Sequence, residues 1–123
     1  MKIEIFTGDA RKYLKNLAKS EIKFDIVYQD AFSSDVNHLL WTVEYFKDIA
    51  DILSKNAILT TYSIATPIRL SIYENKFSIY EYKPNDSNRI TIALNKKEID
   101  NSFKYIDMKL KKTRNTTAKA LYD

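Results

Sequence analysis

The sequence predicts an α/β fold in which a parallel sheet ends in an antiparallel pair of strands. Short β-branched apolar runs alternate with segments of helical periodicity up to residue 75, the pattern of a parallel sheet with helices on its faces. Two further strands, at residues 77–82 and 89–94, follow one another across a short turn and must run antiparallel. No repeat or glycine-rich linker interrupts the chain. We therefore expect one domain at residues 1–96 and a helical, basic tail at residues 97–123.

The first strand is predicted at residues 3–7 (IEIFT), which are short, apolar and β-branched and end at Gly8. Asp9 can cap a helix over residues 10–19, where apolar side chains recur every three to four positions. Residues 24–29 (FDIVYQ) predict a second strand, and the polar stretch that follows them is expected to form a loop.

The clearest helix is predicted over residues 38–54, where an apolar stripe follows steps of three and four: Leu39, Val43, Phe46, Ile49, Leu53. Residues 57–62 are apolar on both faces and predict a central strand. Pro67 suits the first turn of a helix over residues 66–75. The turn-forming run PNDS, which begins at Pro84, joins the last two strands.

The tail carries a helical pattern and a cluster of basic residues. Ile99, Phe103, Ile106 and Leu110 have helical spacing, and the polar segment after them is expected to become ordered only by docking. The basic residues form either a solvated face or a contact to a phosphate backbone: Lys109, Lys111, Lys112, Arg114. The whole chain has a net charge of +4, which suits a polyanionic partner. An AT-rich genome would also give a lysine-rich composition, so both explanations stay open.

Composition excludes several classes of site. The 123 residues include one glycine, one histidine and no cysteine, whereas average usage predicts roughly 8–9 glycines in such a chain. A glycine-rich nucleotide loop is excluded, because it needs several glycines for close backbone approach to phosphate. Disulfides, cysteine zinc sites and histidine-rich metal sites are excluded as well, and we expect no metal. No apolar run could span a membrane and no signal peptide is recognisable, which predicts a cytoplasmic protein with no membrane partner.

Candidate functional residues follow the strands, because ligands of open α/β sheets bind beyond the carboxyl ends of the parallel strands. Two acidic side chains stand there, Asp9 after the first strand and Asp30 after the second. Asp9 is also a suitable helix cap, and Asp30 could be an ordinary loop carboxylate. Phe32 could anchor its loop to the core. His38 has no acid or nucleophile that can be placed beside it, which favours a loop or cap position.

Residues 24–46 (FDIVYQDAFSSDVNHLLWTVEYF), followed by residues 57–63 (AILTTYS) and 66–79 (TPIRLSIYENKFSI), resemble the MnmC-like tRNA methyltransferase domain. The family pattern is a hydrophobic strand followed by D-[AG]-F-[SA]-P, then L/M-W-T, with T-[YF]-S on the next strand. Gly8, Asp9 and Ala10 match a further strand-end motif, and the resemblance covers about residues 3–95. The positions that match the main pattern are Asp30, Phe32, Ser33, Leu40, Trp41, Thr42, Thr61, Tyr62 and Ser63. The family's two prolines are replaced by Ser34 and His38.

The resemblance implies an S-adenosylmethionine-dependent enzyme that methylates the aminomethyl group of a modified wobble uridine of tRNA. Asp9 and Ala10 would bind the adenine of S-adenosylmethionine, and Asp30 would be the catalytic carboxylate on the substrate side. The other implied substrate contacts are Phe32 and Tyr62 as walls, Ser33 in the same loop, Trp41 stacking on a base and Arg69 on a phosphate. From its place near a helix start alone, Trp41 is more often a packing residue than a stacking one.

The family fold has the sheet order 3-2-1-4-5-7-6, and its glycine-rich cofactor loop has no counterpart here. Aligned on that fold, the chain runs from the third strand to the seventh, so the cofactor site is expected to be incomplete and the isolated chain inactive. Losing two strands would leave an apolar edge on residues 24–29. We expect residues 3–7 to move over and pair with this edge, or a second copy or complementing segment to cover it. A non-catalytic module used for binding or assembly is the alternative function.

Overall fold

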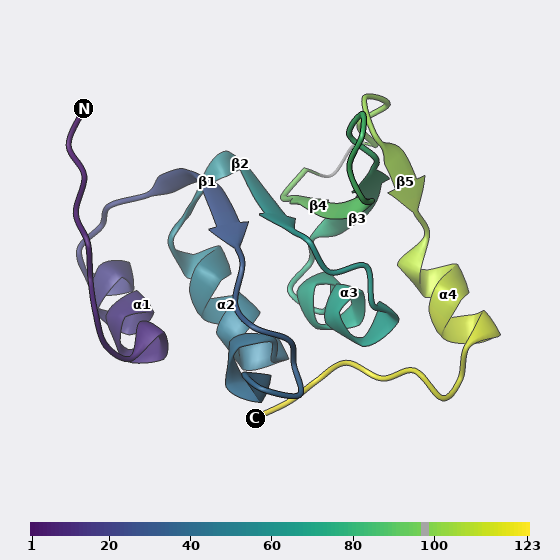
Figure 1. Ribbon diagram of the computed structural model, residues 1–123, viewed down its shortest axis with the longest axis horizontal. Coiled ribbons are helices and arrows are strands. Elements are labelled where there is room, and N and C mark those ends of the chain that lie inside the picture. The colour runs from purple at the N-terminus through teal and green to yellow at the C-terminus, as the bar shows by residue number, and fades with distance from the viewer. Residues whose placement is uncertain (97–98) are drawn as a thin grey trace.

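The computed structural model describes residues 1–96 and 99–123 and confirms the α/β fold class (Figure 1). Five strands form one sheet in the order β1-β2-β4-β3-β5. β1 and β2 are parallel, and the remaining pairs are antiparallel. The first four strands match the predicted order of family strands four, five, seven and six. In chain order the elements are α1 Ala10–Lys19, β1 Phe24–Gln29, the 3₁₀ turn η1 His38–Leu40, α2 Val43–Asp51, β2 Leu53–Thr61, α3 Thr66–Tyr73, β3 Ser78–Tyr82, β4 Ile90–Leu94, β5 Lys104–Ile106 and α4 Met108–Arg114.

The predicted strand at residues 3–7 is wrong, because that segment belongs to no strand. Within the described chain, β1 pairs with β2 alone and forms an edge of the sheet. Residues 3–7 have therefore not moved over to pair with β1. The N-terminal segment is held to α1 instead, where Phe6 stacks on Tyr13 with ring centroids 4.1 Å apart. Gly8 makes this return possible, since its φ is +149° and a Cβ there would lie 2.9 Å from the Phe6 ring.

The helix predicted over residues 38–54 is divided. A 3₁₀ turn covers its first residues, and α2 begins only after Thr42, whose hydroxyl accepts a hydrogen bond from the Tyr45 amide. At the other end α2 stops at Asp51, and Leu53 already starts β2. Phe46, Ile49 and Leu53 of the predicted apolar stripe are buried, but Leu39 is 51% exposed, and the stripe runs through three different backbone conformations. The turn between β3 and β4 is confirmed, with the Ser87 amide donating to the Pro84 carbonyl.

The helical spacing in the tail led to a wrong prediction for part of it. Lys104–Ile106 forms β5, which pairs antiparallel with β3, and the helix begins only at Met108. Asp107 separates the two elements, because its side chain accepts from the Leu110 amide and caps α4. The predicted domain boundary after residue 96 adjoins residues 97–98, which lie outside the described residues.

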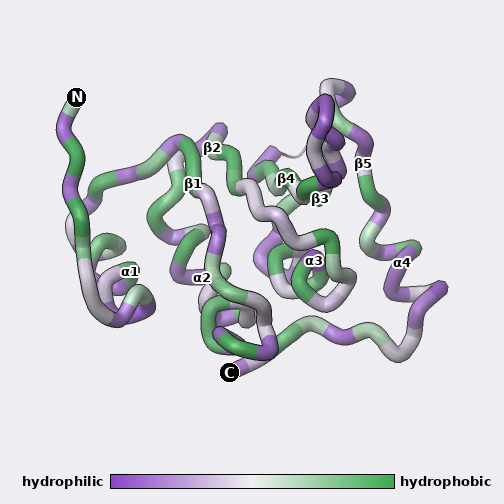
Figure 2. Tube along the Cα trace, viewed as in Figure 1, coloured by the Kyte–Doolittle hydropathy of each residue, from purple (hydrophilic) through white to green (hydrophobic). Residues whose placement is uncertain are grey.

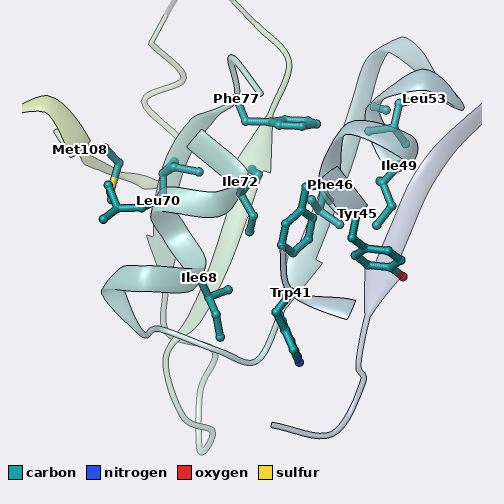
Figure 3. Packing of buried hydrophobic residues seen from close by; sticks show 14 residues of the cluster. Trp41, Tyr45, Phe46, Ile49, Leu53, Ile68, Leu70, Ile72, Phe77 and Met108 are labelled. Atoms are coloured by element: carbon teal, nitrogen blue, oxygen red, sulfur yellow. The ribbon is translucent and has the colours of Figure 1, made fainter. Parts of the chain in front are cut away.

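The main core lies between the sheet and the helices α2 and α3, and the helices gather on one side of the sheet (Figure 1). α1 has no buried residue and adds only the partly buried Leu14. Figure 3 shows Trp41 and Phe46 pointing toward Ile68 and Ile72 of α3. Trp41 and Phe46 are fully buried, and Met108 joins the same cluster from α4. Burial of these large side chains is the main source of the fold's stability.

The opposite face of the sheet is only partly covered. Tyr80, Ile92 and Leu94 are buried there beside Phe103. On β1, however, Ile26 is 52% and Tyr28 76% exposed. Figure 2 shows that hydrophobic residues recur along β1 and the N-terminal segment. A parallel sheet is normally buried on both faces, so the outer face of β1 is an uncovered apolar surface.

The C-terminal segment, residues 115–123, folds back over the helices (Figure 1). Its Leu121 amide donates to the Ser71 hydroxyl, and the Val43 amide donates to the Leu121 carbonyl. His38 lies 2.8 Å from the Tyr122 carbonyl through Nε2, which agrees with a loop position rather than a catalytic one. The segment has thus docked, and its partner is this chain's own helical layer.

Candidate active site

An open depression of about 330 Å³ lies where β1 and β2 end. Asp30 and Tyr62, which the sequence assigned to the site, both line it. They are joined by Tyr28 and Thr60, which are direct neighbours across the parallel strands. Since side chains alternate along a strand, Tyr28 and Thr60 share the outer face of the sheet, away from α2. The remaining lining residues are Gln29, Thr61 and Ile90.

The position of Asp30 is defined by the residue before it. Gln29 is 5% exposed; its Nε2 donates to the Leu40 carbonyl across 2.8 Å, and its Oε1 accepts from the Tyr45 hydroxyl across 3.0 Å. Burial raises the pKa of Tyr45, so this phenol stays protonated and donates. The end of β1 is therefore attached to α2 and to the turn before it.

Two aromatic side chains hold the residues after Asp30. The Tyr62 hydroxyl donates to the Ala31 carbonyl across 2.9 Å, and the Trp41 indole Nε1 donates to the Phe32 carbonyl across 2.6 Å. The two rings meet edge-on with centroids 5.8 Å apart. Trp41 is completely buried, which corrects the prediction that it stacks on a base. Its large apolar ring belongs to the core, and its one polar atom is used inside the chain.

Phe32 and Ser33 lie on the outside of the loop. Phe32 is 75% exposed, so the interpretation that it anchors the loop to the core is wrong. The Ser33 carbonyl accepts from the amides of Val36 and Asn37, at 2.9 and 2.8 Å. This double acceptor forms a tight turn and leaves the Ser33 side chain exposed. Both residues border the carboxyl edge of the sheet, and their contact with a substrate stays a prediction.

Arg69 does not reach the surface. It is 2% exposed, its Nε donates to the Thr91 hydroxyl across 2.8 Å, and its Nη2 lies 3.0 Å from Glu81 Oε1. Burial raises the pKa of Glu81, but the hydrogen bond and charge of Arg69, helped by Arg89 and Lys104, outweigh it and leave that pKa below its ordinary value. The buried ion pair corrects the prediction that Arg69 binds an RNA phosphate.

The residues present fit one end of S-adenosylmethionine. The Oδ1 atom of Asp9 accepts from the amides of Arg11 and Lys12, at 2.9 and 3.4 Å, and caps α1. Its other carboxylate oxygen makes no hydrogen bond within residues 1–96 and 99–123, so capping and adenine recognition are compatible. Ala10 begins α1 beside it. Gly8 is the single glycine of the sequence, and nothing among the described residues resembles a loop for the methionine end.

Sequence reasoning missed several residues of this site. Gln29 is a polar residue at the end of an otherwise apolar strand, a signal that could have indicated a buried hydrogen-bonding role. Tyr28 and Thr60 could have been found from the alternation of side chains once β1 and β2 were paired. Asp123, which connects α1 to α2, gives no local signal because its partners Arg11 and Thr42 are far away in the sequence.

No group of three or more His, Asp or Glu side chains among residues 1–96 and 99–123 could hold a metal ion. Across the same residues, the helices are all too short or too polar to cross a bilayer.

The fold and the strand-end site define a methyltransferase-type α/β domain. Residues 1–98 match the family model for S-adenosyl-L-methionine-dependent methyltransferases, and the chain belongs to that family. It is similar to the crystal structure of MNMC2 from Aquifex aeolicus, with 25% identity and a TM-score of 0.74 over 94% of this chain and 37% of that one. It is also 35% identical over 79 residues to the uncharacterized protein MJ0670 of Methanocaldococcus jannaschii, which covers 64% of this chain and 21% of that protein. The chain thus spans well under half the length of either relative.

Proposed function

We propose that this chain forms the substrate-side part of a methyltransferase that modifies tRNA in the cytoplasm, at the aminomethyl group of a modified wobble uridine. Family membership and the similarity to MNMC2 support the reaction class. The observation that carries the proposal is the environment of Asp30. Its carboxylate makes no hydrogen bond or ion pair with residues 1–96 and 99–123 and lines the open depression, although the residues around it are firmly held.

A carboxylate in this position suits the methylation of an amine. An amine reacts only through a free lone pair, so Asp30 would accept an N–H hydrogen bond, orient the nitrogen and take up the proton that it loses. Phe32 and Tyr62 provide exposed aromatic faces beside it, which also attract a cationic group. Bound S-adenosylmethionine would supply the methyl group.

We also propose that the cofactor site is incomplete in this chain and is completed across the free edge of β1. A groove of about 550 Å³ separates β1 from the N-terminal segment, and apolar residues line it: Leu17, Ile22, Phe24, Ile26, Val27, Ile52. A complementing polypeptide segment or a second copy of the chain would cover this surface and the outer face of β1. The isolated chain is then expected to bind S-adenosylmethionine weakly or not at all. Titration calorimetry that gives micromolar affinity for the isolated chain would contradict this.

A non-catalytic module for binding or assembly is the alternative function. It is favoured by the structural use of two positions that the resemblance had assigned to substrate, since Trp41 and Arg69 are both buried and hydrogen-bonded within the chain.

Methylation of undermodified tRNA distinguishes these functions. The assay measures transfer of a labelled methyl group by the chain together with the polypeptide that completes its sheet. Asp30→Ala should lower the rate roughly a hundredfold or more. Asp35→Ala is the matched control, because Asp35 is an exposed acid of the same loop, and it should leave the rate unchanged. Unchanged methylation by the Asp30 variant would remove this residue from the mechanism and favour the alternative.

A further inference from the structure

Hydrogen bonds hold the chain on both sides of Asp30, through the Gln29 side chain before it and the Ala31 and Phe32 carbonyls after it. Gln29 is fixed by Tyr45 and by the Leu40 carbonyl before the loop begins. After Asp30, the next two carbonyls accept from Tyr62 at the end of β2 and from Trp41 just before α2. Residues 29–32 contain two polar side chains, and within the described residues Gln29 is hydrogen-bonded whereas Asp30 is not.

Burial of the donor groups does not by itself explain both of these hydrogen bonds. Tyr62 is 48% exposed, so its hydroxyl could be hydrated by water at no cost, yet it donates to the Ala31 carbonyl. Trp41 does need a partner for its buried N–H, and the partner is the next carbonyl of the same loop. The two rings also meet edge-on, with centroids 5.8 Å apart, so the two hydrogen-bond donors are packed against each other.

From this arrangement we propose that Trp41 and Tyr62 are positioning residues that orient Asp30 toward the substrate amine. The proposal rests on the proposed function for the role of Asp30, but it concerns a different property, namely how the carboxylate is kept in place. A catalytic group must stay within about 0.5 Å of its productive position. An exposed polar loop would not meet that requirement without the two aromatic hydrogen bonds.

The test uses Tyr62→Phe, which keeps the ring against Trp41 and removes only the hydroxyl. Tyr28→Phe is the matched control, because Tyr28 lines the same depression and is 76% exposed. Hydrogen exchange of the Val36 and Asn37 amides, both bonded to the Ser33 carbonyl, reports loop order without any need for activity. Loss of one hydrogen bond should speed their exchange roughly threefold to tenfold in Tyr62→Phe and leave it unchanged in Tyr28→Phe. If the Val36 and Asn37 amides exchange at the same rate in the two variants, the Tyr62 hydrogen bond does not order the loop and the proposal is overturned.

A double-mutant cycle then tests whether Tyr62 acts through Asp30. In the methylation assay, Tyr62→Phe should lower kcat roughly tenfold to a hundredfold with little change in KM. Adding Tyr62→Phe to Asp30→Ala should have no further effect, because the group that Tyr62 positions is already gone. Additive losses overturn the proposal. If Asp30→Ala alone methylates normally, the proposed function fails, whereas the exchange result still decides whether the Tyr62 hydrogen bond orders the loop.

Discussion

Arg11 and Asp123 stand 112 positions apart in the sequence and form an ion pair of 2.6 Å. Asp123 also accepts from the Thr42 hydroxyl at 2.7 Å, and its own amide donates to Glu44. One residue of the C-terminal segment thus joins the first turn of α1 to the first turn of α2. Four predictions follow from this contact and from others described above.

Asp123→Ala should lower the free energy of unfolding by about 1 kcal/mol. It removes an ion pair and a hydrogen bond, but the Asp123 side chain is 37% exposed, so solvent screens part of the interaction. Urea unfolding monitored by circular dichroism measures the change. Asp35→Ala is the control for loss of an exposed carboxylate and should be neutral. An equal effect of both variants would mean that the contact does not stabilise the fold.

The contribution of Asp123 should depend on pH. The hydrogen bond from Arg11 lowers the pKa of Asp123 below its ordinary value of 3.8, despite partial burial. The Asp123 carboxylate therefore binds a proton more weakly in the folded state than in the unfolded state. The free energy of unfolding rises with pH between the lowered pKa and the ordinary one. The wild type should exceed Asp123→Ala in free energy of unfolding by the full amount at pH values above the ordinary pKa of Asp123. This difference should disappear as the pH falls through the lowered pKa of the folded state. A difference that stays constant in acid would contradict the ionic contact.

Arg69→Ala should destabilise the fold by about 3 kcal/mol, because it breaks a buried ion pair and leaves Glu81 with weaker partners. Arg89→Ala is the matched control: Arg89 lies 3.6 Å from the same carboxylate but its side chain is 55% exposed, so its loss should cost below about 1 kcal/mol. Denaturant unfolding gives both values. Equal costs would show that the burial of Arg69 does not decide its role.

Ile26→Lys should weaken the pairing of two copies through β1, one of the two ways proposed above to cover this edge. Ile26 is exposed on the free edge strand and lines the apolar groove, and a charge on such an edge disfavours pairing with another strand. Ile99→Lys is the control, since Ile99 is 60% exposed but lies on no strand. Sedimentation velocity over a range of concentrations compares them. Identical profiles for the two variants would show that β1 is not the associating surface.

The sequence predicted helices and strands best where the local pattern of residues agrees with the tertiary environment of the segment. The strand at Phe24–Gln29 and the helix at Ala10–Lys19 have periodicity and capping residues that suit their final environment. Residues 3–7 also have a strand-like pattern, yet a strand forms only beside a partner, and none is present within the described chain. Lys104–Ile106 shows the reverse case, in which pairing with β3 overrides helical spacing.

For the site, the sequence placed Asp30 and Tyr62 at the strand ends, where both line the depression, whereas the ligand contacts that the resemblance implied for Trp41 and Arg69 do not fit the burial of these residues. In a sequence, an aromatic residue or an arginine looks the same whether its side chain binds a ligand or another part of the chain. The difference lies in distant partners, such as the Phe32 carbonyl for Trp41 and Glu81 for Arg69. Such partners can be identified only once the strands are placed beside one another.

The contact between the C-terminal segment and α1 has a consequence for folding during synthesis. On the ribosome, α1 emerges long before Asp123 is made, so α1 lacks the Arg11–Asp123 ion pair while the sheet assembles. Contacts between such distant residues slow folding. We therefore expect the first turn of α1 to become fixed only after translation of this segment, although α1 is synthesised before every other helix and strand of the described chain.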